Sequence, residues 1–158
     1  RTASEKGAAG KRKDKSGPLW ESGMREVGGE MAATAMLPDD AAGLSAQLLA
    51  WSQSGGVDLI LTTGGTGLGP RDNMPEATLK VATKLVPGMA EAMRATSMQI
   101  TPRAMLSRGV VAVCQSTLII NLPGSPKAAG ECLDAVMPAL EHALETLCGG
   151  AQECGQQS

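Results

Sequence analysis

The sequence predicts an α/β fold: three layers, α/β/α, with a mostly parallel central sheet and a small β-hairpin near the C-terminal strands. Two observations carry this prediction. Strand-like apolar runs alternate with helical segments, which is typical of βαβ units. In addition, "VDLILT" is apolar almost throughout, which is typical of a strand covered on both faces. The length of 158 residues suits one domain with one sizeable core.

The first half of the chain gives signals of unequal strength. Residues 1–16 are rich in Gly, Ala and Lys without periodicity, which predicts a loop or a frayed end. A short helix is predicted over 18–27, because proline is favoured in the first turn of a helix. "EMAATAML" (30–37) indicates a strand weakened by its alanines, and Asp39 or Asp40 can cap the helix that follows.

The second half alternates more clearly. In the final helix, apolar residues recur at helical spacing and predict a buried stripe. The short link "QS" between two apolar runs predicts a hairpin. The predicted elements are a strand at 57–62, helices at 75–85 and 88–100, strands at 109–114 and 116–122, and a helix at 127–148.

The composition argues against several classes of function. Charge is nearly balanced, with 14 Lys and Arg against 16 Asp and Glu, so no net field favours nucleic acid or a membrane as partner. Without Phe or Tyr, the aromatic platforms of single-stranded nucleic-acid binders are nearly excluded. No apolar run approaches the roughly 18 residues of a membrane span. The four cysteines form no C-x-x-C pair and predict reduced thiols in the cytoplasm.

The stretch "LILTTGGTGLGPRD" (59–72) is the most unusual of the chain. Its four closely spaced glycines let the backbone approach a ligand or bend sharply. Backbone amides in front of a helix bind anions, phosphate above all. The stretch is not a P-loop, because no Gly-Lys-Ser/Thr follows, nor a dinucleotide fingerprint, because Pro70 stands where the third glycine belongs. A purely structural turn is the alternative interpretation.

The charges beside the glycines favour a ligand. Arg71 can pair with a phosphate, whereas Asp72 cannot, and a carboxylate beside a phosphate site usually holds a cation between them. Asp39 follows the preceding strand and is a second candidate of this kind, with a helix cap as its alternative role. In parallel sheets, ligands bind outside the carboxyl ends of the strands. The loops "PDD", "TTGGTGLGPRD" and "PGSPK" can therefore meet at one edge.

Several long motifs in order carry a family resemblance. "DLILTTGGTGLGPRD" with "PEAT", then "TPRAMLSR", then "TLIINLPGSP" resemble the molybdopterin adenylyltransferases, that is, the MogA-like bacterial enzymes and the G domains of gephyrin and plant Cnx1. The resemblance runs from about residue 13 to 148. It implies an α/β/α fold, a homotrimer, and transfer of AMP from Mg-ATP to molybdopterin, which yields adenylated molybdopterin and pyrophosphate in molybdenum cofactor biosynthesis.

The resemblance also implies the site residues. The two aspartates essential to the family match Asp39 and Asp72, as catalytic residues and Mg²⁺ ligands. Such a transfer asks the protein to position groups and to neutralise charge. We expect the pterin near Ser107 and the nucleotide near 14–17. The predicted substrate-binding residues are Asp14, Ser16, Gly17, Thr63, Gly64, Gly65, Thr66, Gly67, Arg71, Ser107, Asn121, Pro123, Gly124, Ser125 and Pro126.

The sequence departs from the family pattern in two places. The family opens with a strand that this chain, starting at Arg1, is expected to lack, so the predicted domain is 1–148 without that strand, followed by a flexible tail at 149–158. Met74 stands where a threonine usually caps the next helix, a loss of about 1 kcal/mol. Asn73 or Asp72 can cap instead, which for Asp72 competes with a metal role.

Two other functions fit the same fold. The chain could be a non-catalytic molybdopterin-binding or trimeric scaffold module, or a domain of the molybdenum-insertion enzyme that receives the adenylated product. The presence of both Asp39 and Asp72 favours catalysis.

Overall fold

The computed structural model describes residues 2–4 and 28–149, and within these one sheet contains six strands. The strands are β1 (Thr2–Ser4), β2 (Thr34–Ala35), β3 (Leu59–Thr63), β4 (Lys84–Leu85), β5 (Val111–Cys114) and β6 (Thr117–Leu122). Their order is β2-β1-β3-β6-β5-β4. The first four in this order run parallel to one another. β5 pairs antiparallel with β6, and β4 pairs antiparallel with β5. The sheet is therefore mixed: three of its five strand pairs are parallel, which agrees with the predicted mostly parallel sheet.

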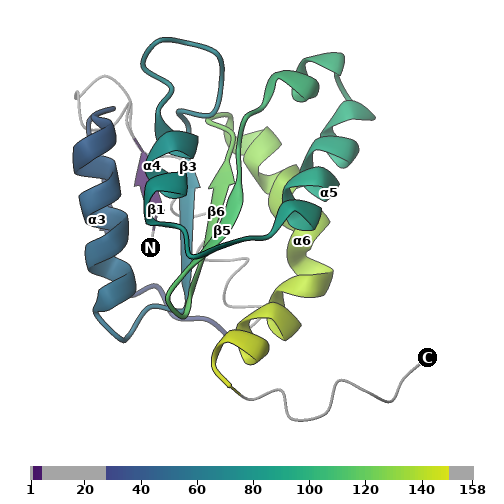
Figure 1. Cartoon of the computed structure of the whole chain (residues 1–158). Coiled ribbons are helices and arrows are strands. Elements are labelled where there is room, and N and C mark those ends of the chain that lie inside the picture. The colour runs from purple at the N-terminus through teal and green to yellow at the C-terminus, as the bar shows by residue number, and fades with distance from the viewer. Residues whose placement is uncertain (1, 5–27, 150–158) are drawn as a thin grey trace.

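Helices cover both faces of the sheet, as Figure 1 shows. α3 (Ala41–Gln53) and α4 (Met74–Val81) lie on one side, and α5 (Pro87–Met98) and α6 (Pro126–Leu147) lie on the other. A short 3-10 helix, η1 (Pro102–Leu106), follows α5. The three-layer prediction is confirmed. Among the described helices, none is long and apolar enough to cross a membrane.

Each face of the sheet has its own hydrophobic core, because successive strand residues point to opposite faces. On β3, Ile60 packs with α3 and α4, whereas Leu61 packs with α5 and α6. On β6, Ile119 belongs to the first core, and Leu118 and Ile120 belong to the second. Burial on both sides explains why these strands are continuous apolar runs in the sequence.

The predicted hairpin near the C-terminal strands is present. β5 and β6 pair antiparallel, with Cys114 opposite Thr117. Gln115, in the two-residue link, has a φ of 57°. This left-handed conformation matches the turns that join strands through two residues.

The predicted helix over 75–85 is wrong in its last four residues. α4 ends at Val81, and Ala82 is already extended, with φ −66° and ψ 130°. Thr83 then donates its backbone N–H and its hydroxyl to the carbonyl oxygen of Val113, at 2.7 and 2.9 Å. β4 follows at the edge of the sheet beside β5. Hydrogen bonds to a distant strand therefore override the local helical preference.

The N-terminal expectations also need correction. The sequence predicts a loop over 1–16 and no opening strand, but Thr2–Ser4 form β1, which pairs in parallel with β2 and β3. The strand predicted over 30–37 is reduced to the two residues of β2. Pairing with neighbouring strands, rather than strand propensity, defines both segments. The predicted helix over 18–27 and residues 150–158 lie outside the described part.

Candidate active site

Two loops leave the sheet side by side. β3 and β6 are parallel neighbours, so both end at the same edge. The glycine loop (64–73) follows β3 and contacts the loop after β6 (123–125). Gly64 donates its backbone N–H to the carbonyl oxygen of Leu122 at 3.0 Å, and a Cβ on Gly124 would stand 3.3 Å from the Gly64 Cα. The structure thus joins two of the three predicted loops.

Asp39, in the third loop, lies against the glycine loop. Gly64 and Gly65 have φ values of 89° and 64°, a left-handed conformation that favours glycine. A Cβ on Gly65 would stand 3.5 Å from Oδ1 of Asp39 and 3.3 Å from the Cβ of Met74. Asn73 donates its Nδ2 to the backbone oxygen of Asp39 at 3.3 Å. All three loops therefore meet at one edge, as predicted.

The helix-capping role that was the alternative for Asp39 is performed by Asp40. Asp40 is the N-cap of α3, and its Oδ2 accepts the backbone N–H of Gly43 at 2.9 Å. Such caps typically contribute about 1 kcal/mol. Asp39 is therefore not required for capping, and its carboxylate lies beside Gly65 instead.

Asp72 folds its carboxylate back into the glycine loop. Its Oδ2 accepts the backbone N–H of Gly69 at 2.8 Å. A Cβ on Gly67 or Gly69 would stand only 2.8 Å from this oxygen, so both positions require glycine while Asp72 keeps its place. The carboxylate does not cap α4: the N-cap is Asn73, which makes no side-chain capping bond. Met74, which stands where the family usually has a capping threonine, buries its side chain in the core.

The two carboxylates fit the oxygen chemistry of Mg²⁺. This ion is usually held by one or two carboxylates, with phosphate oxygens and water completing its shell. Asp39 and Asp72 flank the same glycine loop, one beside Gly65 and the other beside Gly67 and Gly69. Within the described residues, no group of three or more His, Cys, Asp or Glu side chains gathers, so an all-protein metal cage is absent there.

A cavity of about 280 Å³ lies next to the glycine loop. α5, η1 and the beginning of α6 form its mostly apolar wall, with Met93 and Leu106 among the lining residues. Five of the predicted substrate-binding residues line it: Thr66, Gly67, Ser107, Asn121 and Pro123. Neither aspartate does. The predicted site therefore consists of an apolar cavity and an adjoining acidic edge.

Asn121 holds the base of this cavity together. Its side chain is fully buried, and Nδ2 donates to the hydroxyls of Thr62 and Thr78 at 3.0 and 2.9 Å. Its Oδ1 accepts the backbone N–H of Val110 at 3.3 Å. Most of the hydrogen-bonding capacity of the amide is thus used inside the protein. Ser107 is less constrained, since its hydroxyl accepts one long bond, 3.4 Å, from the Gly109 N–H.

The other predicted residues differ in their surroundings. Thr63, at the end of β3, is buried, whereas Arg71 is exposed on the glycine loop. Ser125 is the N-cap of α6 and makes no side-chain capping bond, and Pro126 is the first helical residue. α4 and α6 thus begin beside this edge and direct their positive dipole ends toward it. The predicted residues at 14, 16 and 17 lie outside the described residues.

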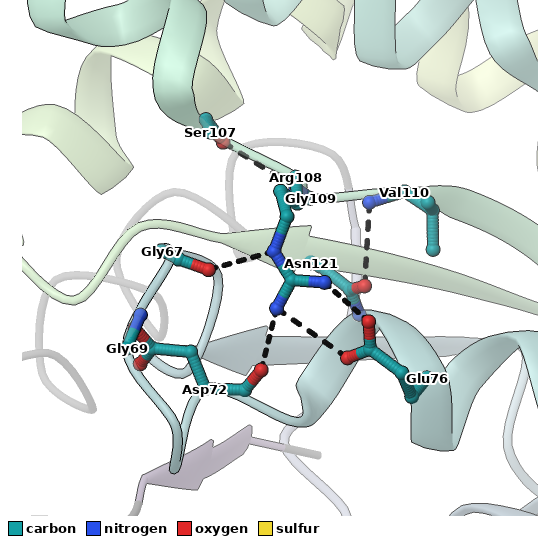
Figure 2. A network of polar contacts seen from close by, with 9 residues as sticks. All are labelled: Gly67, Gly69, Asp72, Glu76, Ser107, Arg108, Gly109, Val110 and Asn121. Atoms are coloured by element: carbon teal, nitrogen blue, oxygen red, sulfur yellow. Dashed lines mark hydrogen bonds and ion pairs between the residues drawn. The ribbon is translucent and has the colours of Figure 1, made fainter.

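Sequence reasoning missed Arg108. Figure 2 shows its guanidinium between the glycine loop and α4. It donates to the backbone oxygens of Gly67 and Asp72 and pairs with the carboxylate of Glu76. The hydrogen bond from Arg108 holds the pKa of Glu76 below its ordinary value. The only signal in the sequence is the position of this arginine directly after Ser107 in "LSR".

Comparison with known proteins agrees with the fold and with these motifs. The family described as a probable molybdopterin binding domain matches residues 2–142. The chain belongs to this family. The family resemblance seen in the sequence is therefore confirmed.

Individual relatives refine this picture. A molybdopterin adenylyltransferase of Helicobacter pylori strain J99 is 46% identical over 101 residues, which cover 64% of this chain and 57% of the relative. A molybdenum cofactor biosynthesis bifunctional protein of Chlorobaculum tepidum is 35% identical over 142 residues, which cover 90% of this chain and 45% of the relative. The chain therefore spans about half the length of these curated relatives.

A solved structure gives the same fold. The molybdopterin biosynthesis enzyme MoaB from Thermus thermophilus is 49% identical, with a TM-score of 0.81. The match covers 94% of this chain and 93% of that chain. The arrangement of sheet and helices is thus that of a known member of molybdopterin biosynthesis.

Proposed function

We propose that this chain is a molybdopterin adenylyltransferase, which transfers AMP from ATP to molybdopterin. One observation carries the proposal: Asp39 and Asp72 flank a single glycine loop, and this loop lies beside a cavity that Ser107 helps to line. The name of the Helicobacter pylori relative supports the same activity. A non-catalytic binding or scaffold module would not need two carboxylates around a loop built to approach phosphate.

In the proposed reaction, the terminal phosphate oxygen of molybdopterin attacks the α-phosphorus of ATP. A new P–O bond forms, the bond to the β-phosphate breaks, and pyrophosphate leaves. The pterin would occupy the apolar cavity near Ser107, and the nucleotide would extend toward 14–17. The glycine loop and the N-termini of α4 and α6 would stabilise phosphate charge, and the exposed Arg71 would pair with a phosphate oxygen.

The proposal includes Mg²⁺, held by Asp39 and Asp72. Bound there, the ion would neutralise the negative charge that the phosphates carry and bring them close to two carboxylates. The residues themselves position the carboxylates: Gly69 binds Asp72, and Asn73 binds the backbone of Asp39. The test is therefore whether removal of either carboxylate abolishes transfer without loss of the fold.

The experiment incubates the purified protein with molybdopterin, ATP and Mg²⁺, and identifies adenylated molybdopterin by mass and pyrophosphate by a coupled assay. We expect product with the wild type. Asp72→Asn should lose turnover by at least about a hundredfold. It should nevertheless fold, because an asparagine oxygen can still accept the Gly69 N–H. No product with the wild type, or equal turnover in Asp72→Asn at saturating Mg²⁺, would refute the proposal.

We also propose a cytoplasmic homotrimer that passes its product to a molybdenum-insertion domain or enzyme. The bifunctional relative supports the link to a second activity. Exposed apolar side chains such as Leu68, Ile100 and Met105 supply surface for self-association. Light scattering coupled to gel filtration tests the trimer, and a monomeric mass at micromolar concentration would contradict it.

A further inference from the structure

Arg108 forms hydrogen bonds with three residues of the glycine loop, and the proposed function gives it no role. Its backbone N–H donates to the carbonyl oxygen of Thr66 at 2.8 Å, and its Nε donates to that of Gly67 at 2.7 Å. One terminal nitrogen, Nη2, donates to the carbonyl oxygen of Asp72 at 2.5 Å. The other, Nη1, is ion-paired with Glu76 on α4 (Figure 2). One residue thus holds the loop at three carbonyls.

These contacts determine which way the peptide groups of the loop face. In a trans peptide the N–H points opposite to the C=O of the same plane, and no described peptide here is cis. Since the carbonyls of Thr66 and Gly67 turn toward Arg108, the N–H groups of Gly67 and Leu68 turn away from it. Carbonyl oxygens repel a phosphate and amides attract one. Arg108 therefore removes repulsive groups from the opposite side of the loop.

Arg108 is itself held in place by a second arginine. Nη1 of Arg94, on α5, donates to the carbonyl oxygens of Ser107 and Gly109, at 3.4 and 2.9 Å. These two carbonyls flank Arg108 in the chain. The backbone that carries Arg108 is thus attached to α5, and its side chain is attached to the glycine loop and α4. The pocket residue Ser107 and the carboxylate-bearing Asp72 become parts of one connected unit.

We propose that Arg108 is a positioning residue for the proposed AMP transfer, which orients the glycine loop and Asp72 while Glu76 orients its guanidinium. This inference rests on the proposed function. Arginine suits the role because its planar fork reaches two carbonyls and a carboxylate at once, whereas lysine is a single flexible point charge. Displacement of a catalytic group by about 1 Å can lower a rate by roughly a hundredfold.

The experiment compares wild type with Arg108→Gln, Arg108→Lys and Glu76→Gln. The matched control is Glu145→Gln, which removes an exposed carboxylate of a different ion pair, with His142 on α6. Three quantities are measured: kcat, KM for molybdopterin, and the hydrogen-exchange rate of the Gly69 amide, which is hydrogen-bonded to the Asp72 carboxylate. The exchange rate needs no substrate, so it reports the loop independently of activity.

We expect Arg108→Gln to lower kcat by about a hundredfold with little change in KM, and to speed Gly69 exchange by about tenfold or more while core amides of β3 stay protected. Arg108→Lys should lie between this variant and wild type, and Glu145→Gln should match wild type. Unchanged kcat in folded Arg108→Gln, or equally faster exchange throughout the protein, overturns the proposal.

Two further outcomes separate the possible failures. If Arg108→Gln does not fold, Glu76→Gln decides: a smaller fall in kcat with faster Gly69 exchange supports the positioning role, and no change in either quantity overturns it. A wild type that makes no adenylated molybdopterin refutes the proposed function and, with it, this role in catalysis. An active wild type with an unaffected Arg108→Gln refutes the positioning role alone.

Discussion

Gly65 offers a test that separates backbone strain from damage to the site. Gly65→Ala places a methyl group on a residue with a φ of 64°, a conformation that costs an alanine about 1–2 kcal/mol. The methyl carbon would stand 3.3 Å from the Cβ of Met74 and 3.5 Å from Oδ1 of Asp39. The first contact is tight and the Met74 side chain is buried, so the backbone must give way slightly. We expect a total loss of roughly 2 kcal/mol.

Gly55, after the end of α3, is the matched control. It has a φ of 73°, and a Cβ there would meet nothing within 4 Å. Gly55→Ala therefore carries the conformational strain without the contact, and should lose about 1–2 kcal/mol. For a chain of this length, each kcal/mol lowers Tm by about 2–4 °C. Urea unfolding and thermal melting of both variants measure the strain, and their difference isolates the contact with Met74 and Asp39.

Activity distinguishes the two variants more sharply than stability does. The methyl group of Gly65→Ala would touch the Asp39 carboxylate without strain but would press on Met74, so the backbone beside Asp39 must shift and AMP transfer should fall by about tenfold to a hundredfold. Gly55→Ala should keep wild-type turnover, because its methyl group would meet no other atom within 4 Å. If Gly65→Ala melts like Gly55→Ala and still turns over at the wild-type rate, then the loop does not present Asp39 to the substrate and the reasoning is refuted.

Three further predictions concern single residues with separable roles. Asp40→Ala should lose about 1 kcal/mol in urea unfolding and keep AMP transfer, because Asp40 caps α3. Asp39→Asn should keep its stability and lose AMP transfer, and the opposite pattern in the two variants would contradict these roles. Asn121→Ala should lose about 3 kcal/mol in urea unfolding, because it removes three hydrogen bonds, with Thr78, the Val110 N–H and Thr62, whose hydroxyl keeps only a 3.5 Å bond to the Ile120 carbonyl oxygen. A loss below about 1 kcal/mol would contradict the network. The hydrogen bond from Arg108 lowers the pKa of Glu76. The free energy of unfolding of the wild type, measured in urea, should therefore exceed that of Glu76→Gln by up to about 1 kcal/mol at neutral pH. That advantage is complete above the ordinary pKa of a glutamate and vanishes as the pH falls through the lower folded-state pKa; a gap that persists in strong acid would refute the assignment.

Local sequence patterns predicted what depends on neighbouring residues. The apolar run of β3 and the stripe on α6 identified a sheet covered on both faces, because burial imposes a period on the chain. The glycine loop was also recognisable, since only glycine readily adopts the φ values of Gly64 and Gly65. Asp39 and Asp72 followed from their positions after strand ends, together with the family resemblance.

Tertiary structure decided what depends on partners far along the chain. β4 exists because Thr83 meets Val113, and no local signal could end α4 so early. In the sequence either Asp39 or Asp40 can cap α3, whereas in the fold Asp40 is the cap and the Asp39 carboxylate lies beside Gly65. The position of Arg108 is the clearest case.

The partners of the Arg108 side chain, Gly67, Asp72 and Glu76, are 41, 36 and 32 residues away in the sequence. Two of these bonds are to backbone carbonyls, which every residue possesses, so the amino-acid identities there carry no information about the contact. The sequence thus determined the fold class, the glycine loop and the two carboxylates. Only the folded chain determined how a single arginine connects the glycine loop with α4, because long-range hydrogen bonds to the backbone leave no period or motif to read.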